Sequence, residues 1–449
     1  MEGLSLGDIG NICGGKVLAN NNEINIQPSS ISIDSRKLER NSLFVALPGE
    51  KTDGHLFTSE ALQNGASCIL VERLPDSITG PTIQVKSVLT ALQELATVYR
   101  RRLNIPVVGV TGSVGKTTTK EMIASVLEQH YSVYKTIGNL NNEIGVPLSV
   151  LSIGDRNDIA VIEMGISDFG EMSVLANIAR PDYMLFTSIG ASHLNKLHDL
   201  QGVFEAKTEA LKFLSYGAKV FYNGDDPFLK KMKCPQTLIS YGVGEHCDVY
   251  ATDIAHYDNG NTELTIHLKD GVIRTRCNQY GDHMIYSILA ASAVADELGL
   301  STSEISHGIS DFQPESHRSH IIKSGQFTII DDCYNANPTS TKMALTSLAH
   351  FSSEKVCILG DMLELGDQSS EYHRQIGAFA EKVGIRKIIA VGSQSSFICD
   401  GAGSTAKSFN TVDELIAALP DFLNCGDTIL VKGSRGMHLE RVVDFLQKL

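Results

Sequence analysis

The sequence predicts an α/β protein of three domains, built on mostly parallel sheets. Short apolar runs that end in polar residues alternate with helical patterns along most of the chain, as in sheets that helices cover on both faces. A glycine-rich loop joins one such run to a helical pattern between residues 107 and 119. The chain has 449 residues, which exceeds what one hydrophobic core usually supports, so two or three domains are expected.

Residues 1–82 are predicted to form a small α/β domain. Helix and strand patterns alternate there, with turn signals at Pro48-Gly49 and Asp53-Gly54. The strand-like segments are 31–36, 42–47 and 68–71, and the helical segment is 58–66. Residues 75–81 carry a proline at each end and are expected to be a linker.

Residues 83–312 are predicted to form a central domain on a mostly parallel sheet. Its strand candidates are 105–110, 159–162, 183–186 and 219–222. In such sheets the ligand binds at the carboxyl ends of the strands, where Glu163, His193 and Asp225 are expected. Residues 250–277 alternate apolar with polar residues and carry two hairpin signals, 259–260 and 270–271, so an antiparallel extension is expected before an alanine-rich helix at 285–298.

Residues 313–449 are predicted to form a second doubly wound, Rossmann-like domain. The strand candidates are 327–330, 356–359, 387–391 and 428–431, and the helical patterns are 340–350, 371–383 and 412–419. Two α/β domains joined near Pro314 would form a cleft that can close on a substrate.

Composition excludes several classes of protein. The net charge of −14 argues against a nucleic-acid partner, and no apolar run is long enough to span a membrane. Residues 1–18 lack the basic start and apolar centre of a signal peptide. The nine cysteines are scattered singly without metal-binding spacing, which indicates free thiols in a reducing cytoplasm.

The glycine-rich loop is the clearest functional signal. Its residues Gly112, Ser113, Val114, Gly115, Lys116, Thr117 and Thr118 follow an apolar run and precede a helical pattern. Backbone N–H groups and a helix N-terminus would face nucleotide phosphates, with Lys116 adding charge and the Thr117 hydroxyl available to Mg²⁺. The glycine spacing departs from the usual phosphate loop, in which Val110 would be glycine. A plain glycine turn with a solvated Lys116 is the alternative, and the order strand, loop, helix disfavours it.

Three further residues are candidates near this loop. Glu163 closes a strand as a Walker-B acid does, so it is expected to hold Mg²⁺ or its water rather than to be a solvated carboxylate. His193 and Lys207 are weaker by spacing alone, because such residues are usually a structural histidine and a helix-surface lysine.

Several longer motifs resemble those of the Mur ligase family, the ATP-dependent amide-forming enzymes of peptidoglycan synthesis. The similar segments are 111–119, 136–148, 163–165, 170–172, 332–338 and 359–366. The run Tyr334-Asn-Ala-Asn-Pro338 is similar to that of the members that add D-alanyl-D-alanine to UDP-N-acetylmuramoyl-tripeptide. The resemblance spans about residues 30–440 and explains the short glycine spacing of the loop.

This resemblance implies a mechanism. ATP phosphorylates the terminal carboxylate of the tripeptide, and the amine of D-alanyl-D-alanine displaces the phosphate from the acyl phosphate. Lys116 would contact the β- and γ-phosphates, and Thr117, Glu163 and His193 would serve two Mg²⁺ ions. Lys207 matches the carbamylated lysine of the family, whose carboxylate-like group would complete a second Mg²⁺ site.

The resemblance also implies binding residues outside the loop. Ser35 and Arg36 would lie near the uridine diphosphate, although a surface arginine is an equal alternative. Substrate contacts are expected from Asn139, Asn142, Asn335 and Asn337, although asparagines in turns often stabilise the turn itself. ATP contacts are expected from Ser287, Arg318 and Asp332, and Lys432 and Arg435 would line the cleft or meet the incoming carboxylate.

Four positions depart from the family pattern. Met284 and Ser287 stand where asparagines are usual, which leaves both the adenine contact and the preference for ATP over GTP open. Ser188 and His317 replace a usual asparagine and a usual glycine.

Rival functions come from other classes. One is a related ligase of the folylpolyglutamate or cyanophycin type, which the 334–338 run disfavours. Others are a nucleotide-driven switch and a scaffold with a dead site, which the intact Lys116, Glu163, His193 and Lys207 disfavour. A monomer is expected.

Overall fold

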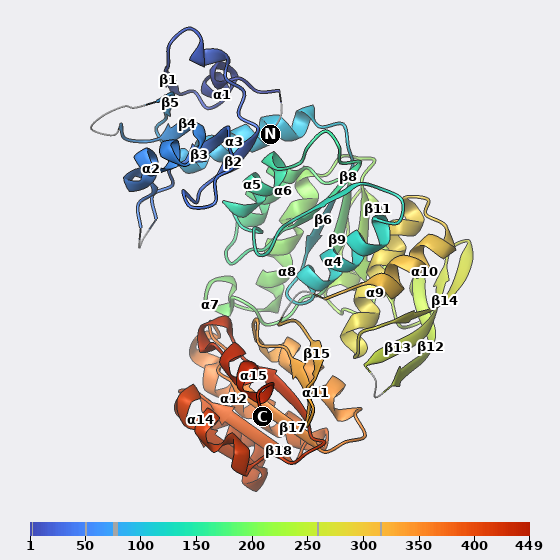
Figure 1. The fold of residues 1–449 in the computed structure, drawn as a ribbon. Helices are drawn as coiled ribbons and strands as arrows, with labels where there is room; N and C mark the ends of the chain where they lie inside the picture. The colour runs from blue at the N-terminus through green and yellow to red at the C-terminus, as the bar shows by residue number, and fades with distance from the viewer. Residues whose placement is uncertain (2, 50–51, 75–79, 258–259, 315–316) are drawn as a thin grey trace.

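The protein has three α/β parts that follow one another along the chain (Figure 1). The computed structural model describes residues 1, 3–49, 52–74, 80–257, 260–314 and 317–449. Its three sheets have five, nine and six strands and are mostly parallel, which confirms the predicted fold class. None of the helices in these ranges combines the length and the apolar character that crossing a membrane requires.

The N-terminal part contains a five-stranded sheet in the order β1-β5-β4-β3-β2. Its strands are β1 (Lys16–Leu18), β2 (Ser30–Ser32), β3 (Ser42–Val45), β4 (Ala66–Val71) and β5 (Thr82–Gln84), and its helices are α1 (Leu6–Ile12) and α2 (Thr58–Gln63). All pairs are parallel except β1 with β5. The boundary predicted at residue 82 therefore falls inside β5, and most of the linker predicted at 75–81 lies outside the described residues.

The middle part is built on a nine-stranded sheet in the order β14-β13-β12-β11-β10-β9-β6-β8-β7. The parallel strands are β6 (Val107–Thr111), β7 (Val133–Lys135), β8 (Ile159–Glu163), β9 (Tyr183–Phe186), β10 (Lys219–Asn223), β11 (Thr237–Gly242) and β12 (Val249–Tyr257). Every residue of β6 and β8 is buried, as expected for strands that helices cover on both faces. The predicted antiparallel extension is present as β13 (Asn261–Leu268), which pairs with β12, and β14 (Gly271–Cys277), which pairs with β13.

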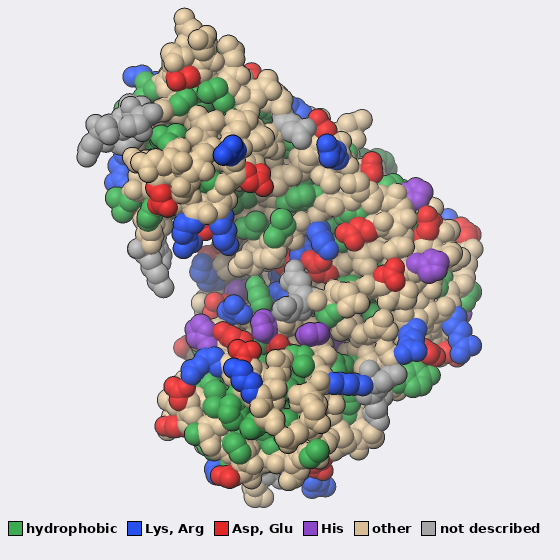
Figure 2. Space-filling model, viewed as in Figure 1, with side chains coloured by type: hydrophobic (Ala, Val, Ile, Leu, Met, Phe, Trp, Pro, Cys, Tyr) green, Lys and Arg blue, Asp and Glu red, His purple; other side chains and the backbone are tan. Residues whose placement is uncertain are grey.

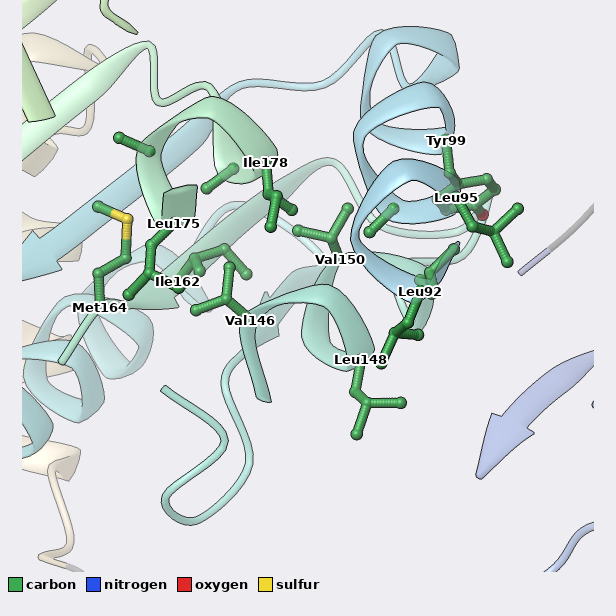
Figure 3. Packing of buried hydrophobic residues seen from close by; sticks show 14 of the residues in the cluster. Leu92, Leu95, Tyr99, Val146, Leu148, Val150, Ile162, Met164, Leu175 and Ile178 are labelled. Atoms are coloured by element: carbon green, nitrogen blue, oxygen red, sulfur yellow. The ribbon is translucent and has the colours of Figure 1, made fainter. Parts of the chain in front are cut away.

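Two helical layers cover this sheet. On one face, α5 (Gly145–Leu151) and α6 (Glu171–Ala179) pack their apolar side chains near Ile162 and Met164 at the end of β8, and α3 (Val88–Arg102) packs on α5 and α6 (Figure 3). On the other face lie α4 (Lys116–Leu127), α9 (Asp282–Glu297) and α10 (Thr302–Asp311). Because α3 also packs on α1, the hydrophobic core formed by α3, α5 and α6 continues into the N-terminal part.

The C-terminal part has a six-stranded sheet in the order β15-β16-β20-β17-β18-β19. Its strands are β15 (His320–Lys323), β16 (Thr328–Asp331), β17 (Lys355–Gly360), β18 (Lys387–Val391), β19 (Ala406–Phe409) and β20 (Thr428–Lys432), and only β15 is antiparallel to its neighbour. Helices α11 (Pro338–Ala349), α12 (Ser369–Lys382) and α13 (Ser395–Ala402) share one core, and α14 (Val412–Ala418) and α15 (Glu440–Leu446) share the other. The predicted doubly wound arrangement is thus present.

Candidate active site

A cavity of about 950 Å³ lies between the middle and C-terminal parts. It is open where the carboxyl ends of β6, β8, β9 and β10 face the loop after β16, the position at which open α/β sheets bind ligands. In Figure 2, charged and histidine side chains gather along the band between the two parts. Fifteen of the predicted site residues line this cavity: Ser113, Val114, Gly115, Lys116, Thr117, Thr118, Asn139, Asn142, Glu163, His193, Ser287, Arg318, Asp332, Asn335 and Asn337.

The glycine-rich loop runs from β6 into the N-terminus of α4 as the sequence predicts. Gly112 and Gly115 have φ angles of +148° and +83°, which side-chain-bearing residues rarely adopt. A Cβ at Gly112 would also lie 1.9 Å from Thr187 Oγ1, so the loop needs glycine there for space as well. The backbone N–H groups at the start of α4 are therefore available to an anion in the cavity.

Hydrogen bonds from the loop after β9 hold the glycine-rich loop in shape. Thr187 Oγ1 donates to the carbonyl of Val114 at 2.6 Å, and Ser188 Oγ accepts from the Val114 N–H at 3.2 Å. Ser113 Oγ donates to the carbonyl of Gly190 at 3.0 Å. These contacts fix the loop in advance, so little ordering remains when a nucleotide binds.

Lys116 is the first residue of α4 and lines the cavity at the end of the glycine-rich loop. Its Nζ donates to the carbonyl of Gly112 at 2.9 Å. Burial lowers the pKa of Lys116, Glu163 opposes that shift, and Arg318 adds to it. A partly buried cation with few compensating charges gains when phosphate oxygens enter the cavity.

Glu163 presents one unpaired carboxylate oxygen. The residue is only 1% exposed, and its Oε1 accepts from Asn141 Nδ2 at 2.8 Å. In the described part of the chain, its buried Oε2 has no hydrogen-bond partner, and the nearest cation is Lys120 Nζ at 4.0 Å. A buried anionic oxygen without a partner is costly. A hard cation near the Thr117 hydroxyl would satisfy it, so these residues fit Mg²⁺.

His193 joins the middle part to the C-terminal part. It precedes the short helix α7 (Leu194–Leu197), and its Nδ1 lies 3.0 Å from Glu364 Oε2 in the loop after β17. Both residues have positive φ angles, +52° and +64°, which are uncommon away from glycine. Burial lowers the pKa of His193, and the Glu364 carboxylate opposes that shift. The imidazole is thus held at the cavity edge, where a neutral ring nitrogen can ligate a metal.

Lys207 lies behind the cavity and does not line it. It sits in α8 (Leu200–Thr208), is 1% exposed, and has no hydrogen-bond or ion-pair partner among the described residues. Burial, and secondarily the charge of Lys116, lower the pKa of Lys207 well below its usual value. An unpaired buried lysine of this kind favours the neutral amine, the nucleophilic form.

The C-terminal wall presents cations to the cavity. Arg318 stacks on the Tyr334 ring with 3.8 Å between its Cζ and the ring centroid. Lys432 Nζ donates to Asp332 Oδ2 at 2.6 Å and to the carbonyl of Asn335 at 3.0 Å. Asp332 also accepts from the Ser319 N–H at 3.1 Å, so it orders the segment that carries Arg318. In this structure Asp332 thus anchors cavity residues and is itself paired.

Asn337 is the N-cap of α11. Its side chain accepts from the Ser340 N–H at 2.8 Å, and Pro338 occupies the first helical turn. We expect Asn337→Ala to lower the free energy of unfolding by about 1 kcal/mol, because one backbone donor loses its partner. Asn337→Ser keeps a capping oxygen and should retain stability in a denaturant titration. A raised KM in the serine variant would indicate substrate contact as well, and an Asn337→Ala protein of unchanged stability would contradict the capping role.

Helix α9 carries Met284 and Ser287, two positions that depart from the family pattern, and only one of them lines the cavity. Ser287 lines it, but its Oγ lies 3.0 Å from Thr119 Oγ1 and ties α9 to α4. Met284 is buried in the core of the middle part. His283 and Tyr286 line the cavity from the same helix.

Two predicted substrate residues lie away from the cavity. Arg36 is exposed and forms an ion pair with Asp34, with 2.9 Å between Nε and Oδ1, and Ser35 is buried beside it. Hydrogen bonds from Arg36 lower the pKa of Asp34 to about 2. Asn142 Oδ1 accepts from the N–H of Gly145, the first residue of α5, at 2.9 Å, while Asn139 is exposed. Gly112, an expected ATP contact, is not among the residues that line the cavity.

The structure adds residues that motif spacing did not single out. Asn141 orients Glu163, Lys120 donates to the Thr136 carbonyl at 2.7 Å beneath it, and Glu364 meets His193. Asn141 and Glu364 stand inside the motif segments 136–148 and 359–366. The motifs mark these segments, but the partners of these side chains depend on how the chain folds.

Three family models match the chain. These describe the Mur ligase family catalytic domain over residues 28–110, the Mur ligase middle domain over 110–295, and the Mur ligase glutamate ligase domain over 317–435. Characterised relatives match over nearly the whole length. The chain is 38% identical over 427 residues to the UDP-N-acetylmuramoyl-tripeptide--D-alanyl-D-alanine ligase of Bacillus subtilis strain 168, with 92% of each chain covered. It is 35% identical over 428 residues to the protein of the same name from Escherichia coli K12, covering 93% of this chain and 94% of the relative.

Solved structures agree with these sequence matches. A crystal structure of MurF from Acinetobacter baumannii superposes with a TM-score of 0.93 at 30% identity, and each chain is covered completely, 100%. The structure of MurF ligase from Thermotoga maritima in complex with ADP gives a TM-score of 0.84 at 29% identity and covers 94% of this chain and 97% of that one.

Proposed function

The chain belongs to the Mur ligase family, and we propose that it joins D-alanyl-D-alanine to UDP-N-acetylmuramoyl-tripeptide at the expense of ATP. It is a ligase of peptidoglycan synthesis, and its product supports cell shape and division. The observation that carries this proposal is the cavity itself. A phosphate-binding loop, an unpaired buried carboxylate and the 332–338 loop of the C-terminal part face one another across it.

The chain's residues suit the transfer of a phosphoryl group. Backbone N–H groups of the loop and Lys116 would bind the β- and γ-phosphates, while Arg318 approaches from the opposite wall. An oxygen of the tripeptide carboxylate bonds to the γ-phosphorus, and the bond to the β-phosphate oxygen breaks to release ADP. The amine of D-alanyl-D-alanine then forms the C–N bond, loses a proton, and displaces phosphate. The protein aligns the partners and stabilises the developing charge.

Thr117, Glu163 and His193 would hold Mg²⁺ beside the phosphates. Bound Mg²⁺ would supply positive charge that offsets the charge of the phosphate oxygens. The Glu163 Oε2 atom supports this assignment, since it has no hydrogen-bond partner within the described residues and its ion pair with Lys120 is long, at 4.0 Å.

Asn141 offers a test of the Mg²⁺ assignment. Because Asn141 orients Glu163 by its hydrogen bond at 2.8 Å, Asn141→Ala should raise the Mg²⁺ concentration for half-maximal activity by about 10- to 100-fold. Asn157→Ala is a useful control for local folding, since Asn157 accepts from the Gly154 N–H in the loop before β8 and is not among the residues that line the cavity. A Mg²⁺ titration that the Asn141 substitution leaves unchanged would contradict the orienting role.

We further propose that Lys207 carries a carbamate. Its neutral amine would attack CO₂ to form an N–C bond, and the displaced proton would pass to solvent. The product is an anion in place of a cation, which would remove the repulsion between Lys207 and Lys116 and serve a second Mg²⁺. The absence of a partner for Lys207 among the described residues supports this modification.

Substrate binding is proposed to involve all three parts. Ser35 and Arg36 of the N-terminal part would meet the uridine diphosphate, with Arg36 contributing a guanidinium that suits a pyrophosphate. Asn139 and Asn142 would line the path of the tripeptide, and Asn335 and Asn337 the site of the incoming dipeptide. All nine cysteines are free, which supports a cytoplasmic protein, and we propose that it acts as a monomer.

The direct test supplies purified protein with ATP, Mg²⁺, D-alanyl-D-alanine and a panel of UDP-N-acetylmuramoyl-tripeptides. Phosphate release should require both substrates, and the product should have the mass of the joined pentapeptide. Ligation of glutamate to a folate, or of aspartate or arginine to a polymer, would instead support the folylpolyglutamate or cyanophycin alternative. Slow hydrolysis without any ligation would indicate a switch.

A further inference from the structure

A second group of potential ligands lies in the C-terminal part, at the end of β16 and outside the Mg²⁺ site. Asp331 is the last residue of β16, Cys333 follows two residues later, and His317 approaches from the segment before β15. His317 Nδ1 lies 2.7 Å from Asp331 Oδ2, and Cys333 Sγ donates to Asp331 Oδ1 at 3.0 Å. Cys333 Sγ and His317 Nδ1 are 3.7 Å apart. Nitrogen, oxygen and sulfur donors thus converge on one point.

The spacing of these atoms is close to that of a metal site. Tetrahedral zinc with bonds of about 2.0–2.3 Å places its ligand atoms about 3.3–3.6 Å apart. The observed separations of 2.7, 3.0 and 3.7 Å bracket that range. Hydrogen atoms now bridge the two shorter pairs, and a cation that replaced them would need the donors to move by only a few tenths of an ångström.

The charges around Cys333 favour a cation. Burial raises the pKa of the Cys333 thiol, and the carboxylates of Asp331, Glu440 and Asp332 raise it further. Glu440, at the start of α15, leaves its buried Oε2 without a hydrogen-bond partner in the described part of the chain. Of these carboxylates, Asp332 is neutralised by Lys432. Glu440 is paired through its other oxygen with His438, at 3.3 Å from Nδ1. A divalent cation would compensate Asp331 and the Cys333 thiolate.

We propose that His317, Asp331 and Cys333 bind a thiophilic divalent transition-metal cation, with Zn²⁺ as the cation whose preferences they match. On binding, the Cys333 S–H bond breaks, its proton leaves to the buffer, and a metal–sulfur bond forms. Zn²⁺ with one thiolate, one carboxylate and neutral imidazole is electrically neutral, which suits a site where Asp331 and Cys333 are 2% and 1% exposed. His317 is partly exposed and leaves a route for the ion.

This site would act on the neighbouring nucleotide cleft. His317 has a φ angle of +64°, in the left-handed region that histidine adopts at a cost. Metal ligation would hold His317 to the end of β16 and so fix Arg318, the next residue, against the cavity. The cation is thus a structural ligand of the Arg318 segment, separate from the Mg²⁺ at Glu163.

The chain contains a matched control. Asp225, His246 and Cys247 form another group of three donors, with His246 Nε2 3.2 Å from Asp225 Oδ1. That group is more open, since the His246 side chain is 52% exposed. Cys247→Ser and Cys333→Ser therefore remove equivalent thiols from two groups of the same composition.

The probe is Co²⁺, added to the full-length chelator-treated protein. Thiolate ligation produces a ligand-to-metal charge-transfer absorption in the near ultraviolet, which Zn²⁺ should bleach by competition. We expect this band in the unmodified protein and in Cys247→Ser, and its loss in Cys333→Ser, whose hydroxyl can still donate to Asp331. The proposal is overturned if the band is absent from the unmodified protein, survives in Cys333→Ser, or disappears in Cys247→Ser.

His317→Asn supplies the second variant should Cys333→Ser fail to fold. Asparagine tolerates positive φ, so the partly exposed position should accept it. Its cobalt affinity should fall by at least about tenfold, the lower end of what losing even an outer-shell partner costs. An unchanged affinity would overturn the assignment of His317 as a ligand, whatever the outcome for ligation activity.

Discussion

Replacing Lys116 by alanine is expected to lower the turnover of ligation by about 10²- to 10³-fold, the usual cost of removing one charge-stabilising donor from a reaction centre. Lys116 is the cation at the glycine-rich loop, where it is partly buried and lines the cavity, and desolvation lowers its pKa. Glu163 compensates its charge only in part, so phosphate oxygens would add to that compensation, and the interaction should be strongest as their charge develops. Steady-state phosphate release with both substrates measures the effect.

Two controls separate this role from general damage. Lys116→Arg keeps the charge but presents a planar fork on a longer side chain, so it should restore little activity. Lys269→Ala removes an exposed lysine from the turn between β13 and β14 and should leave turnover unchanged. Near-normal turnover in Lys116→Ala, with the fold intact by circular dichroism, would contradict the assignment.

Replacing Lys207 by alanine is expected to cost at least about 100-fold in turnover, the upper end of what loss of an outer-shell metal partner costs. The substitution would remove the proposed carbamate from behind Glu163 and His193. It also leaves space in the buried pocket that the lysine filled. A short-chain acid such as acetate can place a carboxylate there, so added acetate should restore part of the activity.

Isotope labelling tests the carbamate without relying on activity. With ¹³C-bicarbonate, the unmodified protein should show a carbamate carbon resonance that Lys207→Ala lacks. Lys212→Ala, on an exposed lysine five positions along the chain, should retain it. Because only the neutral amine reacts with CO₂ and burial lowers the pKa of Lys207, the signal should persist at neutral pH and weaken as acid protonates the amine. Full activity in Lys207→Ala would contradict the catalytic role, and activity that acetate fails to restore would weaken the carbamate proposal.

The buried strands of the fold were predictable from sequence. The runs at 159–162, 183–186 and 387–391 became β8, β9 and β18, because apolar residues on both faces leave little alternative to a covered parallel strand. The hairpins at 250–277 were predictable because their alternation has the two-residue period of a half-exposed strand.

The sheet edges were not predictable in the same way. β7 and β19 are short strands at the sheet edges, and their residues are partly buried or exposed, so they lack a continuous apolar run. Strand β5 was not predicted, because it follows residues 75–81, which are predicted to be a linker. Its pairing with β4 depends on contacts distant in sequence. Neither strand order nor the antiparallel β1 follows from local patterns.

The candidate active site shows the same contrast between features set by local sequence and features set by contacts distant in sequence. The glycine-rich loop between a strand and a helix was predictable because its signal is local, with glycines, Lys116 and Thr117 contiguous between β6 and α4. The pairing of His193 with Glu364 was not, since it joins residues 171 positions apart across two parts of the molecule. The unpaired oxygen of Glu163 is likewise a property of packing around Asn141 and Lys120.

The most direct test of the central claim, that this cavity uses ATP to activate a carboxylate, follows one oxygen atom. UDP-N-acetylmuramoyl-tripeptide labelled with ¹⁸O in its terminal carboxylate is ligated to D-alanyl-D-alanine, and the released phosphate is analysed by mass. Activation through an acyl phosphate predicts that a labelled oxygen appears in the phosphate for each amide bond formed. Unlabelled phosphate released alongside product would contradict the account.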